Sequence, residues 1–447
     1  MRYISSTYHN PFYKDPRSIR HSFMTIPVWS ILLFSFILFG FTNSDSKGKP
    51  DITGSKNVLN SKDSRHTIVP AKIWVGTWST APQLVEPRNM PPAPGLSNNT
   101  LRQVVCVSIG GDNLRVRFSN EFSTSPVTMK AVQIAVSKGE SVIDASTIKE
   151  LKFNGKPEIT MSPGIAITSD PVSFHLEPRM EVAITIYFGQ TSQDVTGHPG
   201  SRTTSYLLEG DKTMSTDFAD AVRTDHWYVI NGIDVKAPES ATAVAILGNS
   251  ITDGRGSGTN KQDRWPDILS ERLLKNPGTH NVAVLNMGIG GNCVLRPCLG
   301  PSGLDRFERD ILKQYGVRWL IIMEGINDIG GTRDSTAASR VANNLIAAYK
   351  QMIDEAHANG IRVYGATLTP ISKSFYYTEY HEAARETVNK WTRNSGRFDA
   401  VIDFDKIMQN PQDTLSMLPE AQSGDFLHPN EKGYKMMGEA IDLKLFK

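Results

Sequence analysis

Hydrophobic positions follow two different patterns in the two halves of the chain. Between residues 71 and 236 they alternate with polar positions in short segments, as in 113–119, where Leu114, Val116 and Phe118 point to one side. Similar segments, separated by Gly, Pro, Asn and Asp, occupy residues 127–136, 172–176, 182–188 and 203–208. Because no helical periodicity of useful length occurs here, the pattern predicts an antiparallel, jelly-roll-like β-sandwich over residues 71–236.

From residue 242 on, short apolar runs alternate with segments of helical periodicity. The candidate strands are 243–247, 282–286, 319–323, 362–367 and 400–404. The candidate helices are 265–275, 304–312, 337–358, 381–394 and 431–445. Apolar strands separated by helices indicate a parallel sheet covered on both faces. Residues 242–447 are therefore expected to form an α/β domain of three layers, α/β/α, with a five-stranded parallel sheet.

The first 70 residues carry a different signal. A short apolar run over 26–41 follows Arg17 and Arg20 and precedes small polar residues, which is typical of a secretory signal peptide. The run is shorter than the roughly 20 residues of a membrane span, which favours cleavage over an uncleaved anchor. We expect a signal peptide over 1–44, or one starting at Met24, and a polar flexible linker over 45–70. The protein would then be secreted or periplasmic in a bacterium, without membrane contact after cleavage.

Composition narrows the class of protein. The chain has 447 residues and a formal net charge of +2, with no long basic run, so we expect no nucleic-acid partner. Three cysteines exclude a disulfide-framework protein. These values are typical of a globular enzyme or binding protein, and they predict no oligomeric state.

Ser250 follows the first strand of the α/β domain by two residues. That strand ends at Gly248, and open α/β folds place their active sites at the carboxyl ends of strands. The position suits a nucleophile, although a serine there also suits a turn or a helix N-cap. The choice depends on residues further along the chain.

Asp425 and His428 lie three residues apart, just before Pro429. On a helix this spacing places two side chains about one turn apart, facing the same way. A carboxylate on one imidazole nitrogen fixes the tautomer and leaves the other nitrogen free to take a proton from a hydroxyl. The alternative is a helix-opening Asp with an exposed His.

Two loops offer hydrogen-bond donors for a developing oxyanion. Residues 286–292 are rich in glycine and follow one strand, and residues 324–330 follow the next strand and contain Asn327. Singly, such loops are ordinary turns or caps. Together with Ser250 and the Asp–His pair, they converge on one edge of one predicted sheet.

These segments resemble four sequence blocks of the SGNH, or GDSL-type, hydrolase superfamily of serine esterases and lipases. The blocks are GNSITDG (248–254), NMGIGGN (286–292), EGINDIG (324–330) and DFLHP (425–429). The resemblance implies a triad of Ser250, His428 and Asp425. It also implies an oxyanion hole made by the N–H groups of Ser250 and Gly291 and the amide of Asn327. Such a site requires no metal or cofactor.

A longer resemblance points to secreted bacterial acylhydrolases associated with xylan breakdown, which carry a β-sandwich ahead of the hydrolase domain. Residues 74–78, WVGTW, match the segment that opens that sandwich. The resemblance implies an acetylxylan-esterase-like enzyme acting on acylated carbohydrate. The chain departs from the superfamily at Asn249, often Asp, and Ile251, often Leu, which affects the local charge but not the nucleophile.

Two other functions fit parts of the sequence. A lipase, lysophospholipase or arylesterase would use the same triad, but no long apolar insertion lies between the hydrolase blocks. A glycan-binding protein with an inactive hydrolase domain would not need the complete set of site residues. The sandwich itself would either bind glycan or shape the cleft from outside.

The remaining cysteines, tryptophans and histidine have mainly structural interpretations. Cys293 and Cys298 either form a small disulfide that braces the oxyanion loop or remain two thiols. We expect Cys106 to be buried in a β-strand. The tryptophans Trp74, Trp78 and Trp227 are expected in the core or between domains, with a sugar-binding platform as the alternative. For Asp225 and His226 we favour packing near the domain junction over a role in a site.

Overall fold

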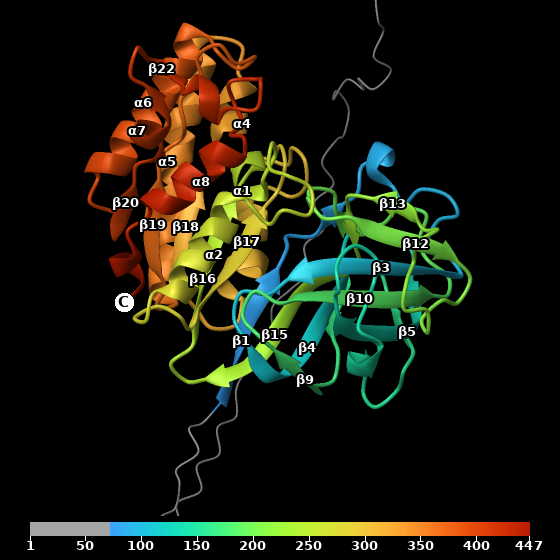
Figure 1. Ribbon diagram of the computed structural model, residues 1–447. Coiled ribbons are helices and arrows are strands. Elements are labelled where there is room, and N and C mark those ends of the chain that lie inside the picture. The colour runs from blue at the N-terminus through green and yellow to red at the C-terminus, as the bar shows by residue number, and fades with distance from the viewer. Residues whose placement is uncertain (1–71) are drawn as a thin grey trace, which may run out of the picture. The chain divides into compact units, whose positions relative to one another are not determined.

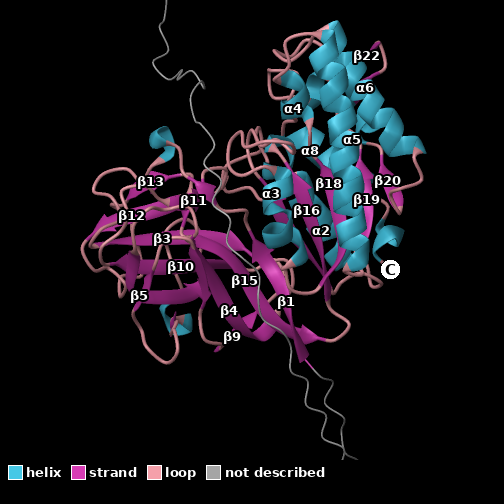
Figure 2. Cartoon of the chain, turned by 180° about the vertical axis from the view of Figure 1, so that it is seen from behind, coloured by secondary structure: helices cyan, strands magenta, loops and turns pink. Residues whose placement is uncertain are grey.

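The computed structural model describes residues 72–447. The predicted signal peptide (1–44) and linker (45–70) lie outside the described residues. Antiparallel sheets come first in the chain and a parallel α/β domain follows, which confirms the predicted fold class (Figures 1 and 2). The two parts pack into one compact unit.

The amino-terminal part is built from β-strands joined by turns and two short 3₁₀ helices. Its first strands are β1 (Lys72–Ser79), β2 (Gln83–Leu84), β3 (Asn99–Cys106), β4 (Gly111–Asn120), β5 (Val127–Val136), β6 (Lys149–Glu150), β7 (Ile159–Met161) and β8 (Ile165–Thr168). The others are β9 (Val172–Leu176), β10 (Glu181–Phe188), β11 (Thr196–His198), β12 (Ser205–Glu209), β13 (Val222–Thr224), β14 (Trp227–Tyr228) and β15 (Ile230–Pro238). The 3₁₀ helices are η1 (Pro87–Asn89) and η2 (Ala145–Thr147).

Two antiparallel sheets carry most of these strands. One has the order β1-β15-β4-β8, with β9 also paired to β4; the other has the order β13-β12-β3-β10-β5-β6, with β7 paired to β5. Strands β5 and β9 have the predicted bounds. Strand β3 was expected only at Cys106, its last residue, and its other residues were not predicted, because nearly all of them are buried, including Arg102, and so the segment shows no alternation. A third, small sheet has the order β14-β11-β2.

The carboxy-terminal part is a parallel sheet between two layers of helices. The sheet strands are β16 (Thr242–Gly248), β17 (Val282–Gly288), β18 (Val317–Met323), β19 (Arg362–Ala366) and β20 (Ala400–Ile402), in the order β17-β16-β18-β19-β20. The helices are α1 (Ser250–Asp253), α2 (Trp265–Lys275), α3 (Gly303–Phe307), α4 (Ile326–Gly330), α5 (Ser335–Ala358), α6 (Glu379–Asn394), α7 (Phe404–Met408) and α8 (Glu431–Ala440). A hairpin is formed by β21 (Gln409–Asn410) and β22 (Asp413–Met417).

Alternate residues of β16 bury against opposite helix layers. Val244 and Ile246 share a core with residues of α2, α7 and α8, whereas Ala245 and Leu247 share a core with residues of α3 and α5. Strands covered on both faces explain the continuous apolar runs from which the sheet was predicted.

The observed helix bounds agree with the predicted bounds for α2 but differ for other helices. Helix α2 has the predicted bounds. The predicted helix 304–312 is instead α3 followed by a π-helical turn, Glu308–Leu312. The last helix ends at Ala440 rather than residue 445, because Ile441 is extended and Asp442 caps a separate 3₁₀ turn, Leu443–Phe446.

The edge strand β17 is covered by the amino-terminal part. The Ser108 hydroxyl lies 3.1 Å from both the N–H and the carbonyl oxygen of Val284, and the N–H of Gly76 donates to the Tyr315 carbonyl at 2.9 Å. The Ser108 bonds satisfy backbone groups of β17 that an open sheet edge would expose, and the Gly76 bond joins β1 to the turn before β18.

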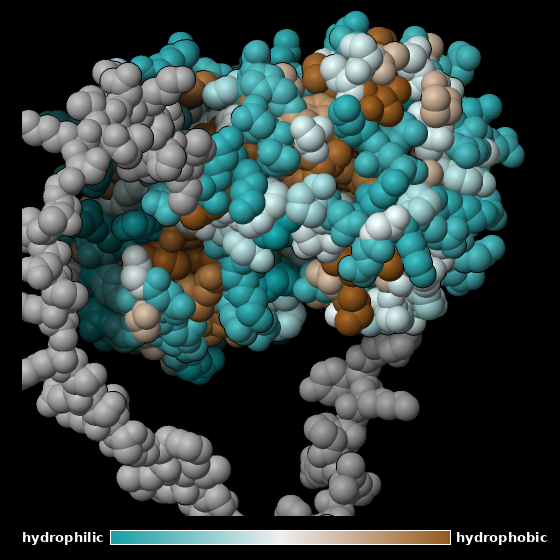
Figure 3. Space-filling model, turned by 90° about the horizontal axis from the view of Figure 1, so that it is seen from below, coloured by the Kyte–Doolittle hydropathy of each residue, from teal (hydrophilic) through white to brown (hydrophobic). Residues whose placement is uncertain are grey.

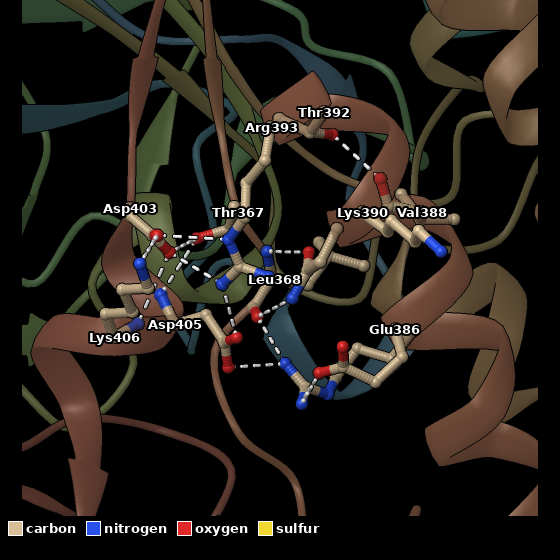
Figure 4. Close-up of polar contacts among 12 residues, drawn as sticks. Thr367, Leu368, Glu386, Val388, Lys390, Thr392, Arg393, Asp403, Asp405 and Lys406 are labelled. Atoms are coloured by element: carbon tan, nitrogen blue, oxygen red, sulfur yellow. Dashed lines mark hydrogen bonds and ion pairs between the residues drawn. The ribbon is translucent and has the colours of Figure 1, made fainter. Parts of the chain in front are cut away.

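Ion pairs connect α6 to α7 at the other side of the sheet. Arg393 donates to Asp403 at 2.7 Å and to Asp405 at 2.6 Å, and Thr367 donates to Asp403 at 3.0 Å (Figure 4). Buried Arg385 also donates to Asp405, at 2.6 Å.

The visible surface is mixed in polarity. Seen from below, hydrophobic residues form separate patches among hydrophilic ones (Figure 3). Among residues 72–447, none of the helices combines the length and apolar character needed to cross a membrane.

Candidate active site

Ser250 is the first residue of α1, directly after the end of β16. Asn249 caps this short helix, because its side-chain oxygen accepts from the N–H of Ile251 at 3.0 Å. Gly248 has no room for a side chain: a Cβ there would lie 2.1 Å from Thr252 Oγ1. The amide at position 249 thus supports a tight strand-to-helix turn without needing the charge of an aspartate.

Ser250, His428 and Asp425 form a chain of hydrogen bonds. Ser250 Oγ lies 2.8 Å from His428 Nε2, and His428 Nδ1 lies 2.6 Å from Asp425 Oδ2. Since an ionised carboxylate only accepts, Nδ1 carries the proton and Nε2 is left to accept from the serine hydroxyl.

Neighbouring groups shift the pKa values of both Asp425 and His428. Burial would raise the pKa of Asp425, but hydrogen bonds from the His428 ring and from the N–H groups of His428 and Leu427 outweigh it and lower the pKa to about 2. Burial lowers the pKa of His428, and the nearby Arg255 and Arg202 lower it further, against the opposing effect of Asp425. The imidazole is therefore neutral, and able to act as a base, at neutral pH.

Asp425 and His428 do not lie on one turn of a helix, so that part of the prediction was wrong. They lie in a turn whose Phe426 has a φ of +54°, and α8 begins only at Glu431, with Asn430 as its N-cap. Asp425 Oδ1 accepts from two backbone N–H groups within the turn and so holds it in a non-helical shape.

The predicted oxyanion donors face the same cleft as Ser250. Among the described residues, neither the N–H of Ser250 nor that of Gly291 donates a hydrogen bond. Asn327 Nδ2 donates one proton to the Asn292 carbonyl at 2.7 Å, while its oxygen accepts from the Tyr376 hydroxyl at 3.0 Å. The second Nδ2 proton remains for a ligand.

The loop after Gly291 is held by covalent and polar contacts. A disulfide joins Cys293 and Cys298, which decides between the two alternatives for this pair. The carboxylate of Asp328 accepts from the N–H groups of Val294 and Leu295 at 2.8 and 3.0 Å.

Arg306 was missed by the sequence analysis. It is fully buried and joins the ends of two strands to the oxyanion loop. Its guanidinium donates to Gly248 O (3.0 Å), Met287 O (2.6 Å), Asn292 Oδ1 (2.9 Å) and Asp310 Oδ2 (3.1 Å). Its neighbours along the chain are mostly charged, as at Asp305 and residues 308–310, so the sequence carried no signal that Arg306 is buried.

The amino-terminal part also reaches the site, through contacts with Asp253 three residues after the serine. His198 Nε2 lies 2.8 Å from Asp253 Oδ1, Arg202 Nη2 lies 3.4 Å from Oδ2, and Asp253 is 2% exposed. A Cβ on Gly200 would lie 2.0 Å from the same carboxylate. No motif marked these residues, because the contact joins two domains.

Ser250, His428, Gly291, Asn327 and Asp253 line one cleft, which has a volume of about 450 Å³. From the amino-terminal part it includes Gln83, Glu86, Arg88, Asn89, Pro199, Gly200, Arg202 and His226. His226 thus lines the cleft besides packing, with its Nδ1 2.6 Å from the Pro199 carbonyl.

The other side chains considered in the sequence lie away from Ser250. Trp78 and Trp227 are buried and pack edge to face, with ring centroids 5.0 Å apart, while Trp74 is partly exposed. Cys106, the last residue of β3, is partly exposed as a whole residue, whereas burial of its thiol raises the pKa of that group to about 12.

Comparison with known proteins identifies the carboxy-terminal half. Residues 246–436 match the GDSL-like Lipase/Acylhydrolase family. No curated protein matches the chain.

Solved structures give only weak likenesses. A family two carbohydrate esterase from Cellvibrio japonicus is 11% identical, covers 84% of this chain and 97% of its own, and has a TM-score of 0.34. A member of the lipolytic G-D-S-L family from Veillonella parvula is 24% identical over 45% of this chain and 96% of its own, with a TM-score of 0.32. A GDSL-like lipase from Bacteroides thetaiotaomicron is 19% identical over 44% and 85%, also with a TM-score of 0.32. At these values the likenesses carry no argument about function.

Proposed function

The carboxy-terminal domain belongs to the GDSL-like lipase/acylhydrolase family of ester hydrolases, and from this premise we propose that the protein removes short acyl groups, acetyl first of all, from plant polysaccharide. The observation that carries the proposal is the chain of hydrogen bonds from Ser250 through His428 to Asp425.

This geometry supports an acyl-enzyme mechanism. Ser250 Oγ attacks the ester carbonyl while His428 Nε2 takes its proton, and Asp425 stabilises the imidazolium. The N–H groups of Ser250 and Gly291 and the amide of Asn327 would hold the oxyanion. His428 then returns its proton to the leaving alcohol. Water, deprotonated by the same imidazole, releases the acid and restores the serine.

The lining of the cleft favours a polar alcohol and a small acyl group. Most lining residues are charged, amide-bearing or glycine, and the apolar ones are Pro199, Leu299, Phe375, Tyr376 and Leu427. A lipase would need a larger continuous apolar surface for a long chain. Phe375 is 70% exposed and offers a ring on which a sugar can stack.

The test combines a variant with a series of esters. We expect Ser250→Ala to lower kcat on p-nitrophenyl acetate by several orders of magnitude with an unchanged circular dichroism spectrum. The control is Ser395→Ala, at the end of α6 and outside the cleft. Esterase activity in Ser250→Ala equal to wild type would reject the assignment.

The substrate class is tested separately with acetylated xylan, acetylated pectin and p-nitrophenyl esters of increasing chain length. Acetate release from polysaccharide and a fall in kcat/KM beyond short chains are expected. A rise in kcat/KM with chain length would favour the lipase alternative. Glycan binding by a folded wild type that hydrolyses no ester would favour the inactive-domain alternative.

We also propose that the protein is exported. The support is the signal-like pattern of the first 44 residues, together with the Cys293–Cys298 disulfide, which suits an oxidising compartment. Amino-terminal sequencing of the protein from culture fractions would test this; a full-length chain retained in the cytoplasm would reject it.

A further inference from the structure

Three arginines from separate segments line the cleft that contains Ser250. Arg88 belongs to η1, Arg202 follows β11, and Arg255 comes shortly after α1. The acidic residues of the same cleft are Glu86 and Asp253. Whether the arginines are free to bind an anionic ligand depends on what those two carboxylates already bind.

Both carboxylates are engaged by other residues. Glu86 accepts from the amides of Gln83 and Asn89, at 2.7 and 2.8 Å. Asp253 is bound by His198, whose other ring nitrogen lies 2.9 Å from the Ala81 carbonyl. His198 thus occupies Asp253 Oδ1, and only Oδ2 remains for the contact with Arg202.

The guanidinium groups therefore remain largely unpaired. Among the described residues, the side chains of Arg88 and Arg255 make no hydrogen bond or ion pair, and both residues are exposed. Arg202 has only the 3.4 Å contact with Asp253, and its Nε is buried without a partner. Its side chain is 31% exposed.

Arg202 is also held in a strained backbone conformation. Its φ is +51°, in the left-handed region that residues with a Cβ rarely adopt, and it follows Gly200, which is pressed against Asp253. Strain of this kind persists where the surrounding structure fixes it, and it occurs often at ligand sites. The loop thus holds the guanidinium at the cleft.

We propose that the enzyme prefers esters that carry a carboxylate close to the scissile bond, bound by Arg88, Arg202 and Arg255. Planar guanidinium groups bind carboxylates through paired hydrogen bonds. On a glycan the carboxylate would belong to a uronic acid; on the acyl side it would belong to a dicarboxylic acyl group such as succinyl. The inference rests on the proposed esterase function and adds a substrate class to it.

Two matched pairs of substrates distinguish these sources. The first is mono-O-acetylated methyl galacturonoside against mono-O-acetylated methyl galactoside, and the second is p-nitrophenyl hemisuccinate against p-nitrophenyl acetate. In at least one pair we expect kcat/KM to be about 10-fold higher for the charged member. The preference should shrink as salt is raised, because the groups are partly exposed. The pair that shows it identifies where the carboxylate lies.

Arginine variants connect the preference to the cleft. Arg88→Gln and Arg255→Gln should each lower the charged-to-neutral ratio of kcat/KM. Arg318→Gln, exposed near the amino end of β18, is the matched control and should leave the ratio unchanged. A ratio near one in both pairs, or a ratio unaffected by either cleft variant, would overturn the inference.

The outcomes separate this inference from the proposed function. If p-nitrophenyl acetate hydrolysis depends on Ser250 but neither pair shows a preference, only the carboxylate inference fails. If hydrolysis does not depend on Ser250, the proposed function itself fails.

Discussion

The hydroxyl of Tyr376 fixes the orientation of the amide that is proposed to hold the oxyanion. It donates to Asn327 Oδ1 at 3.0 Å, while Asn327 Nδ2 donates to the Asn292 carbonyl at 2.7 Å. With both ends bound, the amide plane is fixed and its second N–H points to one place. Tyr376→Phe removes one of these two bonds.

The variant leaves the packing of the ring in place. A Cβ on Gly330 would lie 2.5 Å from Tyr376 Cδ1, so the ring lies directly against the α4 backbone, and phenylalanine keeps that contact. Burial raises the pKa of Tyr376, so the hydroxyl remains a donor throughout the pH range of an esterase assay. Loss of the hydroxyl is then the only substantial change.

The expected effect is moderate and falls on kcat. A net hydrogen bond contributes about 0.5–1.5 kcal/mol, which corresponds to about 2- to 13-fold in rate if it acts in the transition state. Removing the Asn327 amide itself should lower kcat by about 10²–10³-fold. Tyr376→Phe should thus lower kcat on p-nitrophenyl acetate several-fold, with little change in KM.

The neighbouring tyrosine provides the control. Tyr377 is 37% exposed, and Tyr377→Phe should leave kcat unchanged. An effect of Tyr376→Phe confined to KM, or a kcat equal to that of Tyr377→Phe, would refute the role of Tyr376 in orienting the amide. Measuring Tyr376→Phe in the Asn327→Ala background adds a second check, because the loss should then disappear.

Three further predictions concern pH, the buried arginine and the disulfide. Because burial lowers the pKa of His428 and the neutral ring is the base, kcat/KM should hold into mildly acidic solution and fall as the pH drops through that pKa. Arg255→Gln removes a positive charge that lowers this pKa, so the acid limb should move to higher pH; a limb that stays or moves lower would contradict the argument. Arg306→Met leaves several buried acceptors without donors and should reduce the free energy of unfolding by about 3–5 kcal/mol. Denaturant titration measures this loss, and a loss below about 1 kcal/mol would contradict the prediction. Replacing Cys293 and Cys298 by serine opens a short loop and should lower the free energy of unfolding by about 2 kcal/mol. Reduction of the wild-type disulfide should lower it by the same amount. An unfolding midpoint of the serine variant equal to that of the oxidised wild type would contradict this prediction.

The sequence predicted those parts of the fold in which a hydrophobic pattern is sufficient. Strands of the parallel sheet are buried on both faces and appear as continuous apolar runs, and β5 and α2 have the predicted bounds. Strand β3 was expected only at Cys106, and the rest of it was missed because buried Arg102 and Gln103 interrupt its apolar residues. The helical turn assigned to Asp425 was wrong, because spacing alone does not distinguish a helix from a turn held by a side chain.

The site residues were predicted from short sequence blocks. Such blocks indicate the chemical role of a residue even where the bounds of the surrounding helix or strand are not predicted. Residues that make contacts between the two domains are not marked by sequence blocks of this kind. His198 and Arg202 contact Asp253, which lies 55 and 51 positions further along the chain. Taken alone, the short segment that contains them is typical of a turn. Only the folded arrangement shows that this segment forms part of the cleft wall.

The contact at Asp253 connects the amino-terminal part to the reactive serine energetically as well as spatially. A carboxylate that is 2% exposed needs hydrogen-bonding partners, and two residues of the amino-terminal part supply them: His198 from β11 and Arg202 from the segment that follows it. Asp253 is the last residue of α1, the helix that begins with Ser250, so loss of these contacts would disturb the short segment that positions the nucleophile. The amino-terminal part therefore contributes to the site in two ways: it holds a buried carboxylate three residues after the serine, and it places Arg88, Arg202 and His226 in the lining of the cleft.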